Sequence, residues 1–195
     1  MVVAYVEEFK DGRAFLDACG RVIASGKHVV LVDFDLRHPG LSQFFSLHGR
    51  PGVTDVLLRR QSLDQVLVEI PLEVTGIPRE VTGNVRPPGA RSPRAKANQR
   101  AVPMEGRLEV IGRGAPAQNA SDFMVAPSLA DMLGKLESRS DLVIVDGAPL
   151  LLASDGLVLG SVVDSVLFVA RENRLVSSQM RELRRMLSRV SASKL

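Results

Sequence analysis

Two aspartate-rich segments each follow an apolar run that is typical of a buried β-strand. The run HVVLV leads into Asp33 and Asp35, with Arg37 two residues further on. The run LVIV leads into Asp146. In open parallel sheets, ligands bind beyond the carboxyl ends of the strands. A carboxylate there is a hard oxygen ligand that can hold Mg²⁺ against phosphate groups, directly or through water.

Aspartate is also common as a helix cap and at the start of a turn. Either strand end alone would be explained in that way. The two ends together, with the Asp-x-Asp pair followed by a cation, favour a phosphate- and metal-binding edge. The predicted metal ligands are Asp33, Asp35 and Asp146, and Arg37 is a predicted phosphate-binding residue.

The composition is that of an ordinary globular protein from a reducing compartment. Of the 195 residues, 45% are hydrophobic and 24% are charged, which suits one domain. The single cysteine, Cys19, excludes an internal disulfide and a cysteine metal cluster, and three scattered histidines argue against a zinc centre. The most apolar stretch, 150–170, contains two aspartates, so no membrane span is expected. These features predict a cytoplasmic protein.

Short apolar runs alternate with amphipathic stretches along the chain. Strands are expected at 2–6, 28–32, 108–111, 142–145 and 165–170. Helices are expected at 12–25, 41–47, 53–58, 63–68, 128–138 and 177–190. Buried strands separated by helices predict an α/β fold, a three-layer α/β/α sandwich with a mainly parallel central sheet.

One long segment breaks this alternation. Residues 76–107 contain five prolines, seven basic residues and two acidic ones, a net charge of +5 in a chain whose total is +3. Such a segment cannot bury enough apolar surface to offset its chain entropy. We therefore expect a flexible basic loop inserted into one domain that spans 1–195. The loop contains no aromatic residue on which bases could stack, so no specific nucleic-acid binding is expected.

Four blocks of the sequence resemble, in order, the bacterial tyrosine kinases of the capsule-synthesis (CpsD/CapB) type. The blocks are VVLVDFDLRHPGLSQFF, PGVTDVLLRRQSLDQVL, LEVIGRGAPAQNASDFM and DLVIVDGAPLLLASDGLVLGSVVDSVLFVAREN. Those kinases are P-loop proteins of the deviant-Walker (MinD/ParA-like) group. The resemblance implies a P-loop NTPase-like fold and Mg-ATP as cofactor. It also implies that Asp33, Asp35 and Arg37 form the Walker A′ motif, with Asp33 and Asp35 as its catalytic residues, and that Asp146 is the Walker B aspartate.

The phosphate-binding loop of that family is degenerate in this sequence. In the family a glycine-rich loop ends in Gly-Lys-Ser/Thr; its backbone N–H groups and its lysine hold the phosphates. Counting back from Gly26–Lys27, that lysine falls near Asp11, within VEEFKDGRA. Only Lys10, Gly12 and Arg13 remain as candidate cofactor-binding residues. An aspartate near the place of the lysine would repel the phosphates about as strongly as the lysine attracts them. We therefore expect ATP binding to be weak or lost.

The resemblance implies a function in capsule or exopolysaccharide synthesis. The family's tyrosine-rich tail is absent, because the only tyrosine is Tyr5. The leading hypothesis is a non-catalytic or weakly ATP-binding regulator or scaffold of polysaccharide synthesis and export. Its partner would be a membrane polysaccharide co-polymerase or an active kinase paralogue, which would recruit it to the inner face of the membrane, and it could form homo-oligomers.

Two alternatives remain open at this point. The chain could be an active ATP-dependent protein-tyrosine kinase or ATPase with a non-standard phosphate-binding loop. It could also be a MinD/ParA-like partitioning or positioning protein whose basic loop binds DNA or lipid.

Overall fold

A computed structural model describes residues 2–4, 12–71, 106–116, 126–149, 155–167 and 176–188. Most of the expected basic loop at 76–107 lies outside these residues. Its last residue, Arg107, belongs to a strand, so the predicted end of the loop was wrong by at least that residue. The segment around Lys10, where the family's phosphate-binding loop would lie, is also outside the described residues.

The described strands form one six-stranded sheet in the order β3-β4-β2-β5-β1-β6. The strands are β1 (Val2–Ala4), β2 (His28–Phe34), β3 (Val68–Ile70), β4 (Arg107–Ile111), β5 (Leu142–Gly147) and β6 (Ser165–Leu167). All neighbouring pairs are parallel except β3 with β4. The mainly parallel sheet is therefore confirmed.

Six of the described helices were expected from the apolar spacing of the sequence, with shorter bounds in most cases, whereas α6 was not expected. They are α1 (Gly12–Ala24), α2 (Gly40–Phe44), α3 (Val53–Leu57), α4 (Leu63–Val66), α5 (Ala126–Glu137), α6 (Asp155–Val162) and α7 (Ser177–Leu187). Within the described segments, none of them is long and apolar enough to cross a membrane.

The helix expected at 63–68 is wrong at its end, because Val68 starts the antiparallel edge strand β3. Val68 and Ile70 are buried and Glu69 between them is exposed. This period-2 pattern suits a sheet that is buried on one face. A pattern of only three residues is too short to be recognised beside the helical spacing that precedes it.

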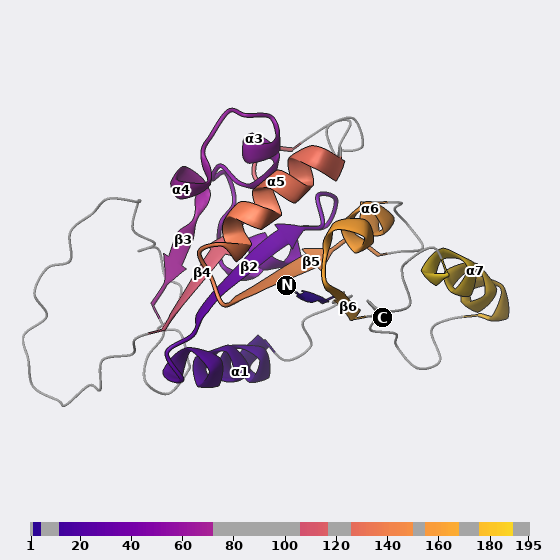
Figure 1. Cartoon of the computed structure of the whole chain (residues 1–195), viewed down its shortest axis with the longest axis horizontal. Coiled ribbons are helices and arrows are strands. Elements are labelled where there is room, and N and C mark those ends of the chain that lie inside the picture. The colour runs from indigo at the N-terminus through magenta and orange to yellow at the C-terminus, as the bar shows by residue number, and fades with distance from the viewer. Residues whose placement is uncertain are drawn as a thin grey trace, which may run out of the picture.

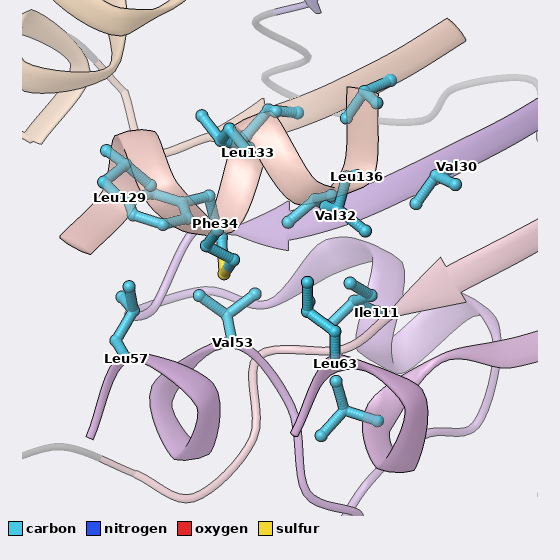
Figure 2. Packing of buried hydrophobic residues seen from close by; sticks show 14 of the residues in the cluster. Val30, Val32, Phe34, Val53, Leu57, Leu63, Ile111, Leu129, Leu133 and Leu136 are labelled. Carbon is cyan, nitrogen blue, oxygen red and sulfur yellow. The ribbon is translucent and has the colours of Figure 1, made fainter. Parts of the chain in front are cut away.

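Helices cover both faces of the sheet, which confirms the three-layer sandwich. On one face, α3 to α6 pack against Val30, Val32 and Phe34 of β2 and against alternate residues of β5. On the other face, α1 and α2 pack against Val29 and Leu31. Figure 1 shows α1 on one side of the sheet and α3, α5 and α6 on the other. Figure 2 shows Phe34 and Val32 between the leucines of α5 and the residues of α3 and α4.

The start of α3 is joined to the chain that leaves β4. The backbone N–H groups of Val53 and Thr54 donate to the carbonyls of Gly112 and Arg113, at 2.9 and 3.0 Å. The buried Thr54 hydroxyl lies 3.1 Å from the Arg113 carbonyl and 2.9 Å from that of Ala115. This junction positions the β4 exit beside the carboxyl end of β2.

Replacing Thr54 with valine is expected to lower the free energy of unfolding by about 1–2 kcal/mol. Valine keeps the shape of threonine but removes the hydroxyl that donates to the Ala115 carbonyl and adds to the backbone hydrogen bond that the Arg113 carbonyl already accepts. Urea unfolding measures the effect. Thr54→Ser, which keeps the hydroxyl, should recover part of the loss; a serine variant no more stable than the valine variant would contradict this explanation.

Candidate functional site

The predicted carboxylates meet at the carboxyl edge of the sheet. Asp33 of β2 and Asp146 of β5 are directly opposite each other in the parallel register. Ala4, at the end of β1, is opposite Asp146 on the other side. The start of α2 lies close by, because a Cβ added at Gly40 would be 3.8 Å from Asp146 Oδ2. The strand ends that the sequence indicated are therefore neighbours.

Asp33 is fully buried, and its carboxylate has one hydrogen-bonded and one bare oxygen. The backbone N–H of Ser42 donates to Asp33 Oδ2 at 2.6 Å. Asp33 Oδ1 accepts no hydrogen bond from the described residues. Burial raises the pKa of Asp33 from 3.8 to about 6; the nearby Asp35 charge adds to this, and hydrogen bonds from Ser42 oppose it.

Asp35 shapes the turn that follows β2. Its Oδ1 accepts the backbone N–H groups of Arg37 at 3.0 Å and His38 at 2.8 Å. Asp35 is 7% exposed, while Arg37 and His38 are exposed. One oxygen of Asp35 therefore caps the turn, as is common for aspartate at the end of a strand. The Arg37 side chain lies at the surface, beside this turn.

Sequence reasoning missed two residues that complete this edge. Ser42, on α2, joins Asp33 to the β4 exit, because its hydroxyl accepts the backbone N–H of Arg113 at 2.8 Å. Arg113 Nη1 lies 3.4 Å from the Leu36 carbonyl, and its buried Nε makes no hydrogen bond to any described residue. Ser42 and Arg113 are 71 residues apart, and neither lies in a pattern that could have indicated the contact.

The carboxylates suit a magnesium ion that also has phosphate ligands. No group of three or more His, Cys, Asp or Glu side chains among the described residues could hold a metal ion by itself. Magnesium keeps several waters and uses one or two carboxylates together with substrate phosphates. The bare, buried oxygen of Asp33 fits such a role, so the assignment of Asp33, Asp35 and Asp146 as metal ligands stays a prediction.

The candidate phosphate-binding residues are described only in part. Lys10 lies outside the described residues. Gly12 and Arg13 are the first two residues of α1, and the structure describes their backbone alone. Their assignment as cofactor-binding residues also stays a prediction.

Comparison with known proteins shows tyrosine kinases as relatives. No family model matches the sequence. The chain is 30% identical over 173 residues to a Ralstonia solanacearum protein named "Putative tyrosine-protein kinase EpsB" and 28% identical over 165 residues to the tyrosine-protein kinase ptk of Acinetobacter johnsonii. These matches cover 88% and 85% of this chain but 19% and 18% of the relatives. The chain thus spans about a fifth of their length.

Solved structures with the same fold include tyrosine-kinase domains. The kinase domain of Escherichia coli tyrosine kinase ETK aligns with a TM-score of 0.65 at 22% identity, over 96% of this chain and 62% of that one. The chimerical protein CapA2B2 aligns with a TM-score of 0.68 at 17% identity, over 100% of this chain and 72% of that one. The chain is a homologue of the bacterial tyrosine-protein kinases and has the P-loop NTPase-type α/β fold of their kinase domains.

One relative carries the link to polysaccharide in its name. The succinoglycan biosynthesis transport protein ExoP of Rhizobium meliloti is 24% identical to this chain over 163 residues, which are 82% of this chain and 16% of ExoP. The relationship to capsule and exopolysaccharide kinases predicted from the sequence blocks is therefore confirmed.

Proposed function

We propose that this chain is a non-catalytic regulator or scaffold of polysaccharide synthesis and export, derived from a tyrosine-kinase domain. The observation that carries the proposal is the segment VEEFKDGRA, which occupies the place of the family's phosphate-binding loop. The segment contains one glycine and three carboxylates, and it contains no Gly-Lys-Ser/Thr. A triphosphate would there meet negative charge in place of a lysine and a nest of backbone N–H groups.

The turn after β2, at the same carboxyl edge of the sheet as the end of β1, supports the proposal. Asp35 Oδ1 accepts two backbone N–H groups of its own turn. Asp35 would keep its place as the cap of this turn after the loss of nucleotide binding.

The proposed partners are a membrane polysaccharide co-polymerase or an active kinase paralogue. Such a partner would recruit the chain to the inner face of the membrane, and copies of the chain could form a homo-oligomer. The named relatives support the kind of partner, because ExoP is named as a transport protein of succinoglycan biosynthesis and the CapA2B2 structure is a chimera that contains a domain with this fold.

Isothermal titration of the full chain with Mg-ATP is expected to show no saturable binding up to millimolar nucleotide. The kinase domain of E. coli ETK, titrated in the same buffer, serves as the positive control. Micromolar affinity that is lost on Asp33→Ala would overturn the proposal. It would favour the alternative of an active kinase or ATPase in which Lys10, Arg13 or a partner's residue supplies the missing positive charge.

A further inference from the structure

A groove of about 1000 Å³ lies between α3, α4 and α5, and none of the residues that line it belongs to the carboxyl edge of the sheet. Its apolar lining includes Leu57, Leu63 and Met132, which are 7%, 8% and 2% exposed. The turn between α3 and α4 forms one rim and the outer side of α5 forms the other. In Figure 1, α3 and α5 lie together on the face of the sheet opposite α1.

Charged side chains surround the groove, and the acidic ones are already paired. Asp64 binds Arg139 at 2.6 Å. Asp131 binds Lys135 at 2.7 Å. Each of these pairs is neutral as a whole.

Two further cations of the rim, Arg59 and Arg60, are exposed. Their side chains make no ion pair or hydrogen bond with any residue that the structure describes. The groove therefore carries two uncompensated positive charges at one end, next to an apolar floor.

The backbone holds these two arginines in place. Arg60 donates its N–H to the Asp55 carbonyl at 2.8 Å, and Arg59 donates to the Val56 carbonyl at 2.9 Å. Arg59 has a φ of 56°, a left-handed conformation that costs a residue with a side chain roughly 1 kcal/mol or more relative to glycine. The hydrogen-bonded turn keeps this conformation and presents both arginines at the rim.

We infer that this groove binds an extended acidic segment of a partner protein. Carboxylates of the segment would pair with Arg59 and Arg60, and an apolar side chain would contact the floor around Leu63 and Met132. Arginine suits the role because its planar guanidinium binds a carboxylate with two parallel hydrogen bonds.

The shape and the charges of the groove favour a polypeptide over other anionic partners. A membrane surface is flat and cannot reach the floor of a concave site. A nucleic acid carries phosphate at every step, whereas the uncompensated charge of the groove is confined to Arg59 and Arg60 at one end, because Asp64 and Asp131 form neutral pairs with Arg139 and Lys135. A polypeptide can place carboxylates at that end and uncharged or apolar groups beside the neutral pairs. The inference does not rest on the proposed loss of ATP binding, because the groove is distinct from the carboxyl edge of the sheet.

Selection from a phage library of random twelve-residue peptides on the immobilised full chain tests the inference. The recovered peptides are expected to share at least two acidic residues and one apolar residue. A labelled synthetic peptide of the consensus sequence is then titrated by fluorescence anisotropy. The Arg59→Glu/Arg60→Glu variant should weaken its binding roughly tenfold or more, since two attractions become repulsions.

A matched variant separates the groove from general charge attraction. Arg21→Glu/Arg181→Glu makes the same charge change at exposed positions of α1 and α7, and it should leave the affinity unchanged within about twofold. Three outcomes would overturn the inference: a selection without an acidic consensus, equal losses in the two double variants, or competition by anionic vesicles or duplex DNA as strong as that by unlabelled peptide. Mg-ATP titration of the same protein reports separately on the proposed function.

Discussion

The Gly52→Ala variant is expected to lose about 3 kcal/mol of unfolding free energy, at the upper end of the cost of overpacking. A Cβ at this position would lie 2.1 Å from the Gly112 carbonyl oxygen and 2.4 Å from the Gly114 nitrogen. Both contacts are with backbone, so no side chain can rotate away. The backbone of Gly52 itself is extended, with φ −160°, so the cost comes from the contact and not from the conformation.

Urea unfolding of Gly52→Ala beside Gly134→Ala measures this effect. Gly134 lies within α5 with nothing within 4 Å of an added Cβ. Alanine there should stabilise the protein by about 0.5–1 kcal/mol, because alanine is the better helix former. A Gly52→Ala variant as stable as the natural chain would show that the α3 and β4 segments do not meet as closely as described.

The Asp33→Asn variant is expected to be more stable than the natural chain above pH 6, by about 3 kcal/mol. The native pKa of Asp33 is about 6 and its ordinary value is 3.8. At a pH between these two values, Asp33 is therefore protonated in the native state and ionised in the unfolded state. The free energy of unfolding therefore falls as pH rises through this window. The native and unfolded pKa values differ by roughly 2 units, and at about 1.4 kcal/mol per unit this gives the expected change in stability. Asparagine resembles the protonated form and cannot ionise.

Urea unfolding between pH 3.5 and 8 in metal-free buffer tests this expectation. The natural chain and Asp33→Asn should be similarly stable below pH 4 and separate between pH 4 and 6. Asp131→Asn, which changes an exposed aspartate of α5, should show no such separation, because exposed ion pairs contribute little. Parallel curves for Asp33→Asn and the natural chain would contradict the raised pKa of Asp33.

Local patterns predicted most of the elements around the site. The run HVVLV predicted β2, and the register places Asp33 beside Asp146 as the parallel topology required. The helical spacing predicted α5 within two residues of its observed start. The edge strand β3 was missed because three alternating residues are a weak signal.

The surroundings of the site depend on contacts that no local pattern contains. Ser42 joins Asp33 to Arg113 across 71 residues, and Arg59 adopts a conformation that favours glycine. A hydrogen bond between distant residues depends on how the whole chain packs, so no spacing can indicate it.

The amino-acid sequence by itself determined the class of fold and the two acidic strand ends. These properties follow from hydrophobic periodicity and from residue type, which are local. Only the tertiary structure decided that one buried oxygen of Asp33 has no hydrogen-bond partner among the described residues, and that no described residue pairs with Arg59 or Arg60 beside an apolar groove. Burial and pairing depend on which surfaces meet after folding, and that is a property of the packed chain.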